Sequence, residues 1–190
     1  TGSGKSSLVS LIPRFSDVTK GAVCVDGVPV GMYPLHDLRA SVGLATQEVF
    51  LFYDTVDGNI AYGDTSLSEE EVKRFAKMAD VDFAEKLPDG FDTVIGERGT
   101  GLSGGHKQRI ALARALAVRP SILILDDTTS AVDLETEKYI QEQLSSLDFP
   151  CTKIIVAQRI STTKRADKIA VLEHGEITQY GTHEELSKKP

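Results

Sequence analysis

The chain has 190 residues, of which 41% are hydrophobic and 26% are charged, proportions that are ordinary for a soluble globular domain. Its formal net charge of −7 argues against a general nucleic-acid-binding protein, because phosphate neutralisation requires clustered lysine and arginine. No apolar run approaches the roughly 20 residues of a membrane-spanning helix, and no secretory signal peptide is visible. The two cysteines, Cys24 and Cys151, adjoin apolar runs, and we interpret them as core thiols in a reducing compartment.

The first residues, TGSGKSS, contain most of the phosphate-binding pattern G-x-x-x-x-G-K-[ST] and lead into an apolar helical run at residues 8–12. In such a loop, glycines let backbone N–H groups converge on phosphate oxygens, and the following helix adds its positive N-terminus. We expect Lys5 to bind the β- and γ-phosphates and the Ser6 hydroxyl to bind Mg²⁺. The residues expected to bind nucleotide here are Gly2, Ser3, Gly4, Lys5, Ser6 and Ser7. The first glycine of the pattern and its preceding strand would fall before residue 1, so we expect an N-terminally truncated fragment.

Two short strands are predicted next. Residues 22–25 precede the turn sequence Asp26-Gly27, and residues 41–45 precede Gln47. The Gln47 amide can ligate Mg²⁺ or hold a water molecule; the alternative is an ordinary polar loop residue.

Residues 54–118 have a helical pattern. Ser68 and Glu71 form a capping-box sequence, which is followed by apolar residues at helical spacing. Further along, Leu102–Arg109 reads LSGGHKQR and precedes a long helical run to Val118. Ser103 can cap that helix, while Gly104 and Gly105 expose its first amides, so this is a second candidate anion-binding helix start. An ordinary capped helix is the alternative, and His106 is expected to be a surface residue and not a metal ligand.

Four aliphatic residues, Ile122–Leu125, predict a strand buried on both faces, as in a parallel sheet. Asp126 and Asp127 follow directly, where a strand of an open α/β sheet would emerge at the ligand-binding edge. Such carboxylates suit a metal and a polyanion, although two solvated loop acids after a core strand would give the same sequence.

The rest of the chain continues the α/β pattern. Residues 130–133 lead into a helix with Ile140, Leu144 and Leu147 on one face. An aliphatic strand at 153–157 precedes Gln158. The last predicted elements are a strand at 168–172, a turn at His174-Gly175 and a polar helix within 181–190. Gln47, Asp126 and Gln158 each follow an apolar strand, and Lys5 follows the expected missing one, so in one parallel sheet they would meet at a single edge.

Taken in order, these motifs resemble those of the nucleotide-binding domain of ABC transporters, over nearly the whole chain. Residues 1–7 are similar to the end of Walker A, Gln47 to the Q-loop glutamine and Leu102–Arg109 to the signature LSGGQ. Residues 122–127 are similar to Walker B and residues 130–133 to the D-loop, while position 158 is where the family has its switch histidine. Residues 93–99, TVIGERG, resemble the X-loop of ABC exporters.

The resemblance implies an α/β P-loop NTPase fold with a RecA-like, mostly parallel core at 1–53 and 119–190 and an inserted helical subdomain at 54–118. It implies ATP and Mg²⁺ as ligands, with Ser6, Gln47 and Asp126 at the metal and Lys5, Asp127 and Gln158 as the catalytic residues. It also implies transmembrane helices before this fragment, a location on the cytoplasmic face of the cell membrane, and a second ABC ATPase domain. In the family, Ser103, Gly104 and Gly105 would complete the ATP site of that partner.

Three positions depart from the family pattern. Asp127 replaces the usual catalytic glutamate and is one methylene shorter, and Gln158 replaces a histidine and cannot pass a proton as imidazole does. His106 replaces the fifth signature residue, which leaves the quality of the donated contact open. We therefore expect a heterodimeric exporter in which this domain's own Walker site is slow. Two alternatives stay open: a nucleotide-gated regulatory module without significant turnover, and a soluble, non-transport ABC ATPase.

Overall fold

The computed structural model describes residues 2–96, 99, 101–157 and 160–188. The chain forms two compact units, one of Thr1–Leu38 with Ile155–Pro190 and the other of Arg39–Ile154. Within the described residues, no helix combines the length and the apolar character needed to cross a membrane.

The first unit contains two hairpins with type I′-like turns. Its strands pair antiparallel: β1 (Cys24–Val25) with β2 (Val28–Pro29), and β8 (Ile169–Glu173) with β9 (Glu176–Gly181). The turn Asp26-Gly27 has φ values of 50° and 77°, and the turn His174-Gly175 has 50° and 83°. Two positive φ angles match the twist of the flanking strands, so both predicted turns are confirmed.

The helices of this unit are short. They are α1 (Lys5–Ser10), the 3₁₀ turn η1 (Val30–Met32), α2 (Leu35–Ala40, which runs into the second unit), α7 (Ile160–Thr163) and α8 (His183–Ser187). The predicted C-terminal polar helix is α8, and a capping box between Thr182 and Glu185 starts it. Cys24 is exposed, so its interpretation as a core thiol is wrong: β1 is two residues long and buries little.

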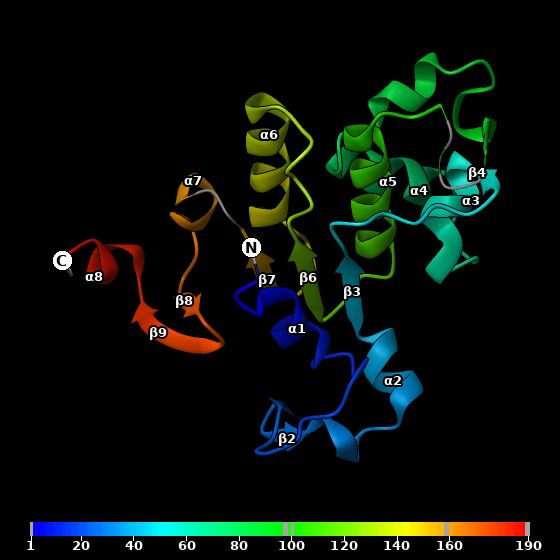
Figure 1. The fold of residues 1–190 in the computed structure, drawn as a ribbon. Helices are drawn as coiled ribbons and strands as arrows, with labels where there is room; N and C mark the ends of the chain where they lie inside the picture. The colour runs from blue at the N-terminus through cyan, green and yellow to red at the C-terminus, as the bar shows by residue number, and fades with distance from the viewer. Residues whose placement is uncertain (1, 97–98, 100, 158–159, 189–190) are drawn as a thin grey trace. The chain divides into compact units, whose positions relative to one another are not determined.

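The second unit contains a three-stranded sheet with β6 (Ile122–Asp126) between β3 (Val42–Ala45) and β7 (Thr152–Val156), as Figure 1 shows. β3 and β6 run parallel, with Val42 opposite Ile122 and Ala45 opposite Leu125. In the central strand Leu123 and Ile124 are fully buried, because apolar residues cover both faces. The predicted parallel core with a buried Walker B-like strand is thus confirmed.

Helices make up most of the remainder of this unit: α3 (Val56–Ile60), α4 (Glu69–Met78), α5 (Gly104–Ala117) and α6 (Leu134–Ser145). Two-residue strands, β4 (Asp54–Thr55) and β5 (Val94–Ile95), pair antiparallel, and 3₁₀ turns lie at 61–63, 82–86 and 90–92. The predicted capping box of α4 is present, with Ser68 and Glu71 each accepting from the other's backbone N–H. Ile140 and Leu144 of α6 are buried as predicted.

Helix α5 packs directly on the sheet. It is alanine-rich and buried along most of its length, so its neighbours approach closely. At Gly43 of β3, a Cβ would lie 2.5 Å from the Ala115 carbonyl oxygen and 2.8 Å from Pro120 Cγ. Only glycine fits there, and the strand and helix backbones therefore touch with no side chain between them.

Candidate functional site

The glycine-rich segment before α1 contains two left-handed backbone positions. Gly2 has a φ of 87° and Gly4 a φ of 92°, values that residues with a side chain rarely adopt. A Cβ at Gly2 would meet nothing within 4 Å, and one at Gly4 would meet only Leu172, at 3.9 Å. Glycine is thus required here by the backbone conformation and not by steric contact of a side chain with its neighbours. Loops whose N–H groups turn toward an anion have the same requirement.

Lys5 begins α1, and its ammonium group donates a hydrogen bond to Ser3 Oγ at 2.7 Å. The Ser3 carbonyl accepts from the Gly175 N–H at 3.2 Å, which ties the loop to the β8–β9 turn. Ser6 and Ser7 are exposed in the first turn of α1. An ammonium group, hydroxyls and the first amides of a helix fit a polyphosphate with a hard cation, and Lys5 and Ser6 would hold them.

The carboxylates after β6 differ in their surroundings. Asp126 ends the strand with 9% of its surface exposed, and Asp127 follows with a φ of 51°. The burial of Asp126 disfavours the interpretation of a solvated loop acid. In the described part of the chain, no cluster of three or more His, Cys, Asp or Glu side chains could hold a metal ion. The expected magnesium ligands are a hydroxyl, an amide and one carboxylate, an all-oxygen set that suits this ion.

Gln47 lies two residues beyond β3, at the same sheet edge as the aspartates, because β3 and β6 are parallel and in register there. Its side chain is exposed in a bend. Lys5 and Ser6 belong to the other unit, and Gln158 lies outside the described residues. The structure thus brings Gln47, Asp126 and Asp127 to one edge, and the meeting of all the predicted residues stays a prediction.

The LSGG segment starts α5 as predicted. Ser103 is the N-cap, and its Oγ accepts from the His106 N–H at 3.1 Å. Gly104 is exposed, whereas Gly105 is buried against the loop after β6. A Cβ on Gly105 would lie 2.8 Å from the Ala131 carbonyl oxygen. The signature-like segment and the D-loop-like segment are therefore in backbone contact.

His106 is half-buried, which corrects its description as a surface residue. Its ring stacks on Phe83, with centroids 3.9 Å apart and an angle of 16° between the planes. Burial lowers the pKa of His106, and the positive charge of Arg109 lowers that pKa further. The ring is held as a flat, apolar surface that packs the start of α5 against the turn at 82–86.

Two functional candidates were missed by sequence reasoning, Gln108 and Asn59. Gln108 is 5% exposed and bonds to Ser130 and Ala131 in the D-loop-like segment. Asn59 is fully buried: its Oδ1 accepts from the Phe52 N–H at 2.8 Å, and its Nδ2 donates to the Phe52 carbonyl at 3.1 Å. It thereby fixes the segment that follows Gln47. No sequence signal separates them from surface polar residues of a helix, because only the tertiary contacts reveal their burial.

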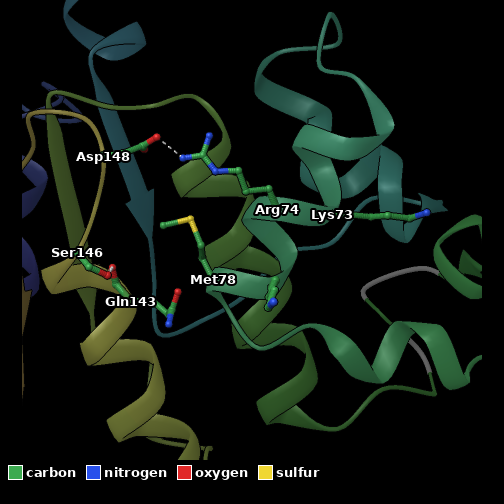
Figure 2. Close-up of a pocket in the computed structure, with 7 residues that line it drawn as sticks. Lys73, Arg74, Met78, Gln143, Ser146 and Asp148 are labelled. Carbon is green, nitrogen blue, oxygen red and sulfur yellow. Dashed lines mark hydrogen bonds and ion pairs between the residues drawn. The ribbon is translucent and has the colours of Figure 1, made fainter.

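A cavity of about 510 Å³ lies elsewhere in the second unit, between α4 and the end of α6, as Figure 2 shows. Arg74 and Asp148 form an ion pair at this cavity, and the Lys73 side chain extends away from that pair. The other lining residues are Lys77, Met78, Gln143 and Ser146. None of the predicted nucleotide or metal ligands lines the cavity, so it is separate from the candidate site.

Comparisons with known proteins agree with this description. A family model described as "ABC transporter" matches residues 1–130. An uncharacterized ABC transporter ATP-binding protein of Bacillus subtilis (strain 168) is 50% identical over all 190 residues, which make up 32% of that protein. A protein of Staphylococcus aureus (strain NCTC 8325 / PS 47), named "Putative multidrug export ATP-binding/permease protein", is also 50% identical over the whole chain, which covers 33% of its length.

A solved structure of a bacterial Atm1-family ABC exporter with ATP bound matches 98% of the chain, with a TM-score of 0.94 and 41% identity. The match covers 33% of that protein, so the chain spans about a third of the length of these three relatives. The predicted P-loop ATPase fold is confirmed. This chain is an ATP-binding domain of the ABC transporter family.

Proposed function

We propose that this domain binds ATP with Mg²⁺ and hydrolyses the terminal phosphoanhydride to power export across a membrane, from its cytoplasmic face. The observation that carries the proposal is the identity of 50% across the full chain to an ATP-binding/permease protein named for multidrug export. The match to an ATP-bound ABC exporter structure supports the same direction of transport. Both relatives weigh against a soluble, non-transport ATPase.

The proposed roles follow from the chemistry of each side chain. Lys5 binds the β- and γ-phosphates, and the Ser6 hydroxyl and the Asp126 carboxylate hold Mg²⁺, with Gln47 assisting. A bound magnesium ion would neutralise charge on the phosphate oxygens. Water then attacks the γ-phosphorus and gives its proton to Asp127 as the general base, while the bond to the β–γ bridging oxygen breaks and ADP leaves. Gln158 donates a hydrogen bond to a γ-phosphate oxygen. Positioning and charge stabilisation provide most of the catalysis.

The partners are a transmembrane domain and a second ABC ATPase domain. One relative is named as an ATP-binding and permease protein, and the present chain covers only 33% of it, which leaves room for a permease in the remaining sequence. In the proposed dimer, Ser103, Gly104 and Gly105 contact the ATP held by the partner's Walker residues, through the exposed N-terminus of α5.

Within this function, we assign a slow Walker site to this chain and a faster one to its partner in a heterodimer. Asp127 is one methylene shorter than glutamate, which withdraws its carboxylate from an attacking water; loss of general-base assistance costs about 10²–10⁴-fold in rate. The left-handed backbone at Asp127, with a φ of 51°, offers a conformational reason for the shorter residue, since aspartate tolerates this region comparatively well. Gln158 adds a second loss, because an amide cannot relay a proton.

The test restores the family residues in the full-length transporter. Asp127→Glu with Gln158→His is expected to raise ATP turnover at this chain's Walker site by about 10²-fold, the lower end of general-base effects. Turnover is measured as phosphate release with the partner's Walker site inactivated, and trapping of a photoreactive ATP analogue on each chain measures nucleotide binding per site. Lys5→Met serves as the control that removes binding at the same site. Trapped nucleotide without any gain in turnover would instead support a regulatory module, and thermal unfolding checks that glutamate is accommodated at position 127.

A further inference from the structure

Gln108 links the start of the signature helix to the loop that follows β6. It lies in the second turn of α5 and is 5% exposed. Its Nε2 donates to Ser130 Oγ at 3.1 Å, and its Oε1 accepts from the Ala131 backbone N–H at 3.1 Å. The oxygen and the nitrogen of one buried amide thus bond to two consecutive residues of the same loop. The two bonds together fix the orientation of the loop relative to α5 as well as its distance from the helix.

The surrounding packing makes this link rigid. Gly105 and Gly104 lie three and four residues before Gln108, so all three share one face of α5. A Cβ on Gly105 would lie 2.8 Å from the Ala131 carbonyl oxygen, and one on Gly104 would lie 3.5 Å from Ala131 Cβ. Ala131 therefore has its carbonyl against the helix start and its N–H on Gln108, and it cannot shift along α5 without losing one of these contacts.

Hydrogen bonds extend this restraint to both ends of the loop after β6. The Ser130 N–H donates to the Asp127 carbonyl at 3.3 Å, so the residue held by Gln108 is bonded to the proposed general base. At the other end, Asp133 caps α6 by accepting from the N–H groups of Glu135 at 3.0 Å and Thr136 at 2.9 Å. These bonds form a continuous path from Gln108 to Asp127 within one compact unit.

We propose that Gln108 is a positioning residue, which holds residues 130–133 and the signature residues Ser103–Gly105 as one rigid surface for the ATP site of the opposite subunit. The inference rests on the proposed function, in which this surface completes the partner's site. Gln108 itself touches no reacting atom. Its amide sets the distance between two donated segments that must reach the same nucleotide.

The test uses the full-length transporter with Gln108→Met, which keeps the length and apolar bulk of the side chain but leaves the Ala131 N–H without its acceptor. Losing the acceptor of the Ala131 N–H is expected to lower kcat at the partner's Walker site about tenfold, while the KM for ATP changes less than about twofold. Ser130→Ala removes one of the two bonds and is expected to lower kcat about threefold. The double variant should be no worse than Gln108→Met alone, because both changes break the same contact.

Hydrogen exchange gives a readout that is independent of turnover. The Ala131 amide should exchange faster in Gln108→Met, whereas Gln143→Met, the same chemical change at a partly exposed position of α6, should alter neither exchange nor kcat. Faster exchange with unchanged kcat would overturn the positioning role and leave the proposed function intact. A loss of turnover confined to this chain's own Walker site would contradict the donated signature, and with it the place where Gln108 acts. An equal effect of Gln143→Met would also overturn the inference.

Discussion

At the scale of single residues, Arg109 of the signature helix α5 forms an ion pair with Asp80 that is largely buried. Arg109 Nη1 donates to the Asp80 carboxylate at 2.7 Å and to its carbonyl at 2.8 Å, and the two side chains are 15% and 27% exposed. Arg109 also lies over the Phe83 ring, 4.8 Å from its centroid. Two hydrogen bonds to Asp80 and a ring contact thus hold the guanidinium group of the residue next to Gln108.

We predict that Asp80→Ala lowers the free energy of unfolding by about 1–3 kcal/mol, because it leaves a half-buried guanidinium without its carboxylate. Asp80 has a φ of 58°, so alanine also adds backbone strain. Asp80→Asn is the matched control: it tolerates the left-handed backbone and keeps an acceptor oxygen. Urea unfolding of the ATP-binding domain should therefore rank the wild type above Asn, and Asn above Ala. Equal stability of the two variants would contradict the role of the ion pair.

His106 gives a prediction about pH. Its pKa in the fold lies below the ordinary histidine value of about 6.5 because burial against Phe83, and then the Arg109 charge, disfavour protonation. In the window below pH 6.5 the unfolded chain therefore binds more protons at this residue than the folded chain does, and the stability contributed by neutral His106 falls as pH decreases. We expect His106→Gln to reduce the drop in unfolding free energy between pH 7.5 and pH 5. Ring-proton NMR should show a His106 midpoint below 6.5, and a midpoint above it would refute the assignment.

At the scale of elements, the contact between α5 and the loop after β6 is set by two adjacent glycines that differ in surroundings. An alanine Cβ at Gly105 would lie 2.8 Å from the Ala131 carbonyl oxygen, whereas one at Gly104 would lie 3.5 Å from the Ala131 methyl group. Gly105→Ala should cost about 1–3 kcal/mol of stability, since the backbone must shift, while Gly104→Ala should be neutral or slightly stabilising in a helix. Differential scanning calorimetry of the two variants checks this, and similar melting temperatures would disprove the close approach.

Elements governed by local chemistry could be predicted from the sequence. The Asp26-Gly27 and His174-Gly175 turns, the Ser68–Glu71 capping box and the Ser103 cap all depend on neighbouring residues, and the structure confirms them. The buried strand Ile122–Leu125 was also recognisable, because apolar residues occupy both of its faces. Boundaries were less accurate: β1 begins at Cys24 and not at residue 22, since pairing with only two residues of β2 decides its length.

At the scale of the whole molecule, the candidate site was predictable only as a set of residue types. Parallel pairing of β3 with β6 places Gln47 at the same sheet edge as Asp126 and Asp127, as the order of strands suggested. The supporting residues Gln108 and Asn59 could not be predicted from the sequence. Gln108 bonds to a residue that is distant in the sequence, and the bond of Asn59 to Phe52 is seen only in the folded structure. A polar residue in a helix pattern has the same appearance whether it faces solvent or a buried loop.

The proposed exchange of signature segments between subunits gives a prediction for the assembled transporter. Ser103→Arg in this chain places a bulky charge at the exposed start of α5 and should lower turnover at the partner's Walker site by at least about 10²-fold, since an anion-binding helix start is obstructed. ATP binding to this chain's own Walker residues should be retained. Site-specific labelling of each chain with a photoreactive nucleotide separates the two effects. Loss of labelling on this chain alone would show that the segment serves its own subunit.

Gly43 has a mechanical consequence for such an assembly. The carbonyl of Ala115 would lie 2.5 Å from any Cβ at this position, so strand β3 and helix α5 meet without a compressible layer of side chains. Gln47 lies just beyond one end of β3, and Gly104 and Gly105, which we propose contact the partner's nucleotide, begin α5. We therefore expect a displacement of β3 to move α5 with it, because no side chain between the two backbones could change rotamer to absorb it.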